Sequence, residues 1–170
     1  FNSIMELSYS SNSLGSLYIE KSNYSAAKKN FAESLLLKNK ALKLKPNNKD
    51  LLRDKSDTIS WLAKTEEKLS NFNEAVNILE GAVDVITKLI ADYPSDASLF
   101  YTSANLYMQQ SYLLSYLSDK RMAHKKASLA NQVINEALVQ DPKNNKFQLM
   151  YYRSLAHSLM LSTDEATDST

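Results

Sequence analysis

The sequence predicts an all-α protein: an array of antiparallel helix hairpins, three and a half repeats long. The first indication is its three prolines, at positions 46, 94 and 142, which are 48 residues apart both times. Two residues after each proline comes a residue type that favours a helix N-terminus: Asn48, Asp96 and Asn144. Turn residues at such a regular spacing are typical of a helical repeat. The second indication is that 170 residues include only two glycines, too few for the turns of a β-protein.

The first unit, residues 1–47, is expected to form two helices. Residues 1–21 carry apolar side chains at the three- and four-residue spacings of an amphipathic helix: Ile4, Leu7, Leu14, Leu17 and Tyr18. Ser22-Asn23 then interrupts the pattern. A second helix is expected over 24–45, because the residue before a proline is disfavoured in helical conformation.

The later units repeat this organisation in register. In unit 48–95 we expect helices over 49–69 and 72–93, and in unit 96–143 two helices separated at Ser118-Asp119. A capping helix is expected over 144–161 and a polar, frayed tail over 162–170. The seven helices would make a single domain, residues 1–161, since a lone hairpin cannot bury its apolar face. Because the register extrapolates to a unit boundary just before Phe1, we expect a piece of a longer protein.

Composition and charge exclude several classes of function. The net charge of +1 gives no general attraction to nucleic acid, and no apolar run approaches the roughly 20 residues of a membrane span. The absence of cysteine excludes disulfides and thiolate chemistry, and it leaves the compartment open, with the cytoplasm favoured. With Gly15 and Gly81 as the only glycines, a glycine-rich phosphate loop is excluded.

No catalytic or metal constellation is visible. His124 and His157 lie in different units, and neither has a second ligand at helical spacing. Glu66 and Glu67 are adjacent and point in different directions on a helix, so we expect a solvated or capping role for them. We therefore expect neither a cofactor nor an enzyme.

A run of basic residues near the end of the first hairpin has two interpretations. It could form an anion or nucleic-acid patch, or simply a solvated face with favourable charge at a helix C-terminus. We favour the second, because no aromatic side chains are interleaved for base stacking. The run comprises Lys38, Lys40, Lys43, Lys45, Lys49, Arg53 and Lys55.

The first unit resembles a tetratricopeptide repeat. Its matching residues are Leu14-Gly15, Tyr18, Tyr24, Ala27, Phe31 and Ser34. The later units depart from the pattern, with Glu66 in the Tyr place and Ser111 in the Gly place. The period also departs, at 48 residues against about 34 for the family. The resemblance implies a right-handed α-solenoid whose concave face is lined by the first helix of each unit.

The resemblance also implies which side chains would line that groove. Tyrosine, with ten copies, is enriched and is a good contact residue, since it offers a large area with a polar tip. The alternative is a groove that is solvated or filled by its own side chains. The expected partner-binding residues are Tyr9, Asn12, Ser16, Asp57, Ser60, Lys64, Asn105, Met108, Tyr112 and Arg153.

The function that we expect is that of a non-enzymatic protein–protein interaction scaffold, which binds a peptide or protein in the groove. The alternative is a ligand- or peptide-sensing regulatory segment of a larger signalling or transcription-regulating protein. The expected partners are proteins or peptides rather than nucleic acid or membrane. The unpaired end helices also leave open a homodimer formed through them.

Overall fold

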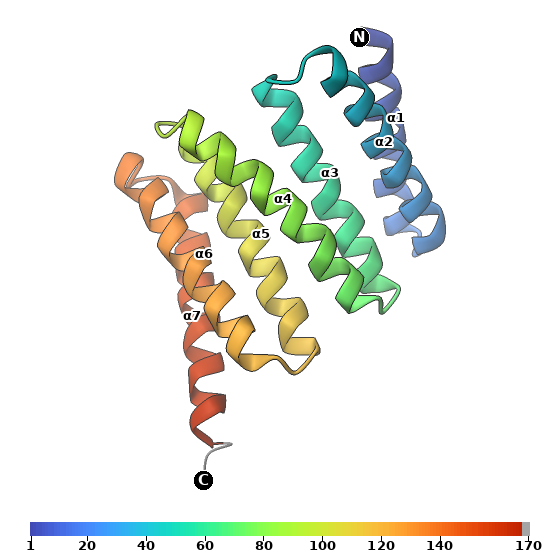
Figure 1. The fold of residues 1–170 in the computed structure, drawn as a ribbon. Helices are drawn as coiled ribbons and strands as arrows, with labels where there is room; N and C mark the ends of the chain where they lie inside the picture. The colour runs from blue at the N-terminus through green and yellow to red at the C-terminus, as the bar shows by residue number, and fades with distance from the viewer. Residues whose placement is uncertain (168–170) are drawn as a thin grey trace. The chain divides into compact units, whose positions relative to one another are not determined.

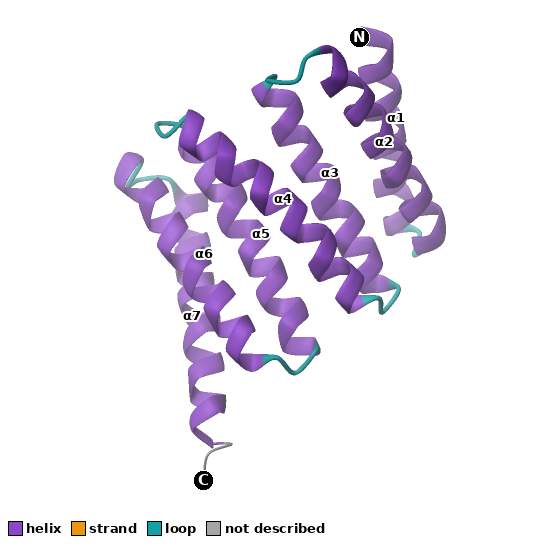
Figure 2. Cartoon of the chain, viewed as in Figure 1, coloured by secondary structure: helices purple, strands orange, loops and turns teal. Residues whose placement is uncertain are grey.

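Seven α-helices make up the part of the chain that the structure, a computed structural model, describes: residues 1–167 (Figures 1 and 2). No strand occurs among these residues, and consecutive helices within each unit run in opposite directions (Figure 1). The all-helical prediction is thereby confirmed. The helices are α1 (Asn2–Glu20), α2 (Tyr24–Leu44), α3 (Lys49–Lys68), α4 (Phe72–Asp92), α5 (Ala97–Tyr116), α6 (Lys120–Gln140) and α7 (Asn145–Thr167).

The last helix is longer than the sequence pattern suggested. We expected a polar tail from residue 162, but α7 continues to Thr167. Neither proline nor glycine occurs in 162–167, so no helix-breaking residue ends α7 before Thr167. Residues 168–170 of the expected tail lie outside the described range.

The two helices of each hairpin are connected by one turn, and the three turns have the same geometry. Ser22, Ser70 and Ser118 adopt positive φ angles of 55°, 63° and 61°. This left-handed conformation lets the next backbone N–H turn back and donate to a carbonyl of the last helical turn, as Asn71 N does to Glu66 O at 2.9 Å. The turns recur every 48 residues, at the breaks that the sequence predicted.

The chain divides into two compact units, Phe1–Val85 and Ile86–Thr170, with the boundary inside α4. In the first unit, α2 packs against both α1 and α3. Close approach of α1 and α2 requires Gly15, because a Cβ there would lie 2.8 Å from the ring of Phe31. Phe31 in turn forms a buried cluster with Ala27 and Leu62, and Ile78 of α4 packs against it.

The face that α1 buries differs from the one that its leucines indicated. Leu7, Leu14 and Leu17 are exposed, whereas the buried residues of the helix are Met5, Ser8, Ser11 and Gly15. The reason is that α2 approaches the small residues closely, and the leucines are then left on the other side. In α3 and α7 the position equivalent to Leu17 is buried, at Thr65 and Leu161.

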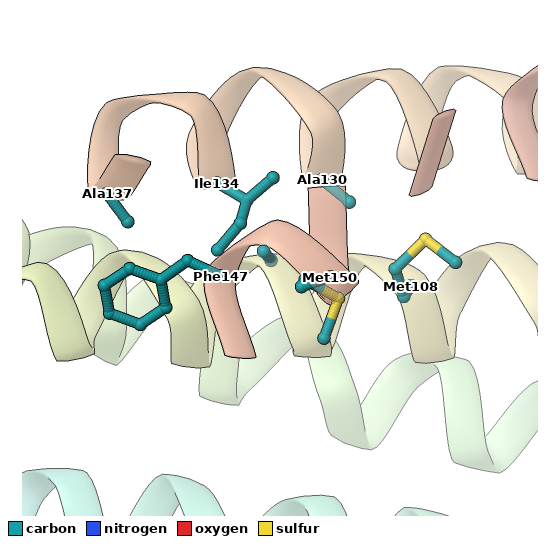
Figure 3. Packing of buried hydrophobic residues seen from close by; sticks show 7 residues of the cluster. Met108, Ala130, Ile134, Ala137, Phe147 and Met150 are labelled. Atoms are coloured by element: carbon teal, nitrogen blue, oxygen red, sulfur yellow. The ribbon is translucent and has the colours of Figure 1, made fainter. Parts of the chain in front are cut away.

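The second unit packs α6 between α5 and α7. Alanines of α6 again provide close contact, and Ile134 faces Phe147 and Met150 of α7 (Figure 3). Ser111, in the place of the repeat's glycine, is fully buried and donates a hydrogen bond of 2.7 Å to the carbonyl of Ala123. A hydroxyl thus replaces the missing glycine without leaving a polar group unpaired. Within the described residues, no helix is long and apolar enough to cross a membrane.

Candidate interaction surface

Some of the sequence-predicted residues of the compact unit Phe1–Val85 lie where side chains of α1 and α3 meet. Tyr9 is 48% exposed, and its hydroxyl donates a 2.9 Å hydrogen bond to Asp54 Oδ2. One turn further along α1, Asn12 Oδ1 lies 3.1 Å from Thr58 Oγ1, which donates to it. These two hydrogen bonds join side chains of α1 and α3 that are 45 and 46 positions apart in the sequence. An exposed tyrosine held in one position has little side-chain conformational entropy left to lose on binding.

A buried lysine lies beneath this surface. Lys38 is 2% exposed, and its ammonium donates to Thr58 Oγ1 at 2.8 Å and to Ser34 Oγ at 3.1 Å. The same nitrogen lies 5.5 Å from the centre of the Tyr9 ring. Burial lowers the pKa of Lys38, and the negative charges of Asp54 and Asp57 partly oppose that shift. The cation therefore connects all three helices through a polar network instead of a direct ion pair.

Asp57 lies beside this network, at one of the predicted groove positions. Desolvation and the neighbouring Asp54 carboxylate raise its pKa, although the side chain still reaches solvent. Burial and the hydrogen bond to Asp54 also raise the pKa of Tyr9. Two neighbouring carboxylates, one of them bonded to Tyr9, therefore lie on this surface, and Arg53 and Lys38 are the positive charges that act on Asp57.

The other predicted positions of the first unit are placed differently. Lys64 lies with its ammonium 4.9 Å from the centre of the Trp61 ring, a cation–π contact on α3. Ser16 donates back to the carbonyl of Asn12 within α1. Ser60 is half-buried. Only Tyr9, Asn12 and Asp57 therefore belong to the surface around Lys38.

In the second unit the predicted residues separate into core and surface. The rings of Tyr112 on α5 and His157 on α7 lie 4.3 Å apart. Arg153 is exposed and Asn105 half-buried. Met108 is only 3% exposed and packs in the core of Figure 3, so it does not line an open surface. The pattern could not distinguish Met108, because a core methionine and a groove methionine occupy neighbouring angles on one helix.

Two further sequence interpretations need correction. Glu66 is buried rather than solvated: its carboxylate accepts from Lys28 at 2.6 Å and from Asn71 Nδ2 at 2.8 Å. Lys38 is buried too, so the basic run is not one continuous surface patch. The Lys45 ammonium lies over the Phe1 ring, and Arg53 pairs with Asp50. These contacts satisfy several of the charges within the fold.

A cavity that we did not predict lies between the end of α6 and the beginning of α7. Its volume is about 320 Å³, and the side chains that line it are uncharged. Gln148 is fixed there by donating to the carbonyl of Pro142 at 2.8 Å. The sequence feature that pointed to this region is the adjacent tyrosine pair of α7, Tyr151 and Tyr152. The lining residues are Asn135, Leu138, Pro142, Gln148, Tyr151 and Tyr152.

Comparison with known proteins gives the fold. No protein-family model matches the sequence, and no curated protein matches it. Among solved structures, the TPR domain of Arabidopsis OM64 is similar, with a TM-score of 0.50 and 16% sequence identity. The match covers 91% of this chain and 98% of that domain. The chain is a tetratricopeptide-like helical repeat protein. Within the described residues of this repeat protein, no three His, Cys, Asp or Glu side chains are grouped to hold a metal ion.

Proposed function

We propose that this tetratricopeptide-like protein is a non-enzymatic interaction scaffold, which binds a peptide segment of a protein partner on the surface formed by α1 and α3. The observation that carries the proposal is the exposed Tyr9, fixed by Asp54 above the buried Lys38 network. Interface hot spots are enriched in tyrosine, and a tyrosine that is already fixed binds at a lower entropic cost.

The charge of this surface indicates what the peptide should carry. Asp54 accepts the hydrogen bond of Tyr9 and lies close to Asp57, and the pKa of Asp57 is raised by desolvation and, to a smaller extent, by repulsion from the Asp54 carboxylate. A cationic side chain of a partner would relieve that repulsion. We therefore propose a peptide in which an arginine or lysine stands close to an apolar or aromatic side chain, the first for the carboxylates and the second for the Tyr9 ring.

Selection from a library of random peptides displayed on phage tests this proposal. Peptides enriched on the native chain should carry the basic–apolar combination, and Tyr9→Ala should weaken their binding about tenfold or more. Tyr116→Ala is the matched control, because Tyr116 is also an exposed tyrosine but lies at the end of α5. The proposal is wrong if no sequence is enriched, or if the control variant weakens binding as much as Tyr9→Ala.

A further inference from the structure

The last helix carries an apolar stripe that nothing in the described chain covers. Leu149, Tyr152 and Leu159 are 60%, 65% and 58% exposed, and Ala156 between them is exposed as well. Their spacing of three, four and three residues places them on one side of α7. The opposite side carries the buried Phe147, Met150, Ser154 and Leu161. The helix is therefore apolar on two faces, of which only one is packed.

The order of large and small side chains along this stripe fits a second copy of itself. The positions follow the heptad pattern a, d, a, d, and in antiparallel helix pairs an a position faces a d position of the partner. Leu149 would then face Leu159 of the other copy, and Tyr152 would face Ala156. Each large ring thus meets a small residue, and the arrangement is the same from both sides, as a two-fold axis requires.

We propose that the chain forms a homodimer in which the α7 helices of two copies pack antiparallel about a two-fold axis near Ser154. This interface is distinct from the α1 and α3 surface proposed for peptide binding. The uncharged cavity lined by Tyr151 and Tyr152 borders the stripe. A charged or polar partner segment would not bury the three large apolar side chains against apolar surface, whereas a second α7 does.

The size of the stripe sets the expected strength of the dimer. From Leu149 to Leu159 it is about 15 Å long, at 1.5 Å per residue. It therefore buries less than the roughly 1,200 Å² of a standard interface, and we expect a weak, reversible dimer. Arg153, at the edge of the stripe, approaches its own copy near the axis. Salt screens this repulsion, so association strengthens as salt is added.

Sedimentation equilibrium of the chain over a range of concentrations tests the dimer. We expect a reversible monomer–dimer equilibrium that Leu159→Glu abolishes. Leu14→Glu is the matched control, because Leu14 is also an exposed leucine but lies on α1. The proposal is overturned if the native chain is monomeric throughout, if it forms open-ended oligomers, or if Leu14→Glu abolishes association, which would indicate head-to-tail stacking.

Cross-linking tests the antiparallel arrangement independently, since the native chain contains no cysteine. Leu149→Cys and Leu159→Cys should form a disulfide-linked dimer when the two variants are mixed and oxidised. Neither variant should cross-link efficiently by itself, because each position faces the other one in the partner. Efficient self-cross-linking of Leu149→Cys would indicate parallel helices and would overturn the proposal, as would failure of the mixed pair to react.

Discussion

Gln110 is a fully buried side chain on α5, and neither of its polar side-chain atoms has a hydrogen-bond partner. The equivalent positions of the two earlier units, 48 and 96 residues before it, are Leu62 and Leu14. A buried amide without partners costs about 1–3 kcal/mol. The third repeat, residues 96–143, therefore contains one position at which the polar residue opposes stability.

Replacing this amide should stabilise the fold. We expect Gln110→Leu to raise the free energy of unfolding by about 1–3 kcal/mol, because it removes the unpaired donor and acceptor at nearly constant volume. Chemical denaturation measures the change. Gln148→Leu is the control: it removes a side chain that does bond, to the carbonyl of Pro142, and it should not stabilise. An unchanged or lower stability of Gln110→Leu would contradict the account of this site.

His157 should make the stability of the folded chain depend on pH. Desolvation lowers the pKa of His157, and its Nε2 is buried without a hydrogen-bond partner. In the unfolded chain a histidine titrates near about pH 6.5, so below that pH the unfolded state binds a proton that the folded state does not yet take up. Stability should therefore fall as the pH decreases from about 6.5 toward the lower pKa of the folded state.

The variant His157→Phe separates this effect from other titrations. It retains an aromatic ring against Tyr112 but has no proton to bind. We expect the variant to lose less stability than the native chain when the pH is lowered from about 7 to about 5. Parallel denaturation curves at several pH values measure the difference. Identical losses in both proteins would show that His157 is not the group responsible.

At the scale of the helices, the two glycines have opposite effects on packing. Gly15 of α1 lies against Phe31 of α2, so Gly15→Ala places a methyl group 2.8 Å from the ring and should destabilise the protein by about 1–3 kcal/mol. A Cβ at Gly81 of α4 would meet no atom within 4 Å apart from its chain neighbours and the backbone of its own helix. Gly81→Ala should therefore stabilise by about 0.8–1.0 kcal/mol, the difference in helix propensity.

Thermal or chemical denaturation of both glycine variants checks this contrast. A double variant Gly15→Ala with Phe31→Leu should recover part of the loss, because it removes the ring that the new methyl group meets. Two variants with the same sign would contradict the packing that places α1 against α2. The control is internal, since both substitutions are chemically identical and both positions are helical.

The sequence predicted the helices well for a physical reason. Proline positions and the Ser-Asn or Ser-Asp pairs determine local backbone geometry, and these signals do not depend on distant contacts. Which face of α1 is buried could not be predicted in the same way. The leucines suggested one face, but Gly15 and two serines allow α2 to approach much closer on another, and close packing decided the outcome.

At the scale of the whole molecule, the candidate surface was predictable only in part. Tyr9, Asn12 and Asp57 lie around one polar network, whereas Met108 belongs to the core. The role of Lys38 was not visible from sequence, since a lysine within a basic run is ordinarily solvated. Its burial depends on the hydroxyls of Ser34 and Thr58, which are 24 residues apart and meet only in the folded chain.

The most direct measurement of the central claim is a titration of a selected peptide into the ¹⁵N-labelled chain, followed by amide chemical shifts. The proposed scaffold function predicts that the largest changes occur at Tyr9, Asn12 and Asp57 and that they disappear in Tyr9→Ala. Changes confined to α7, or an unchanged spectrum at saturating peptide, would contradict the proposal that α1 and α3 form the partner-binding surface.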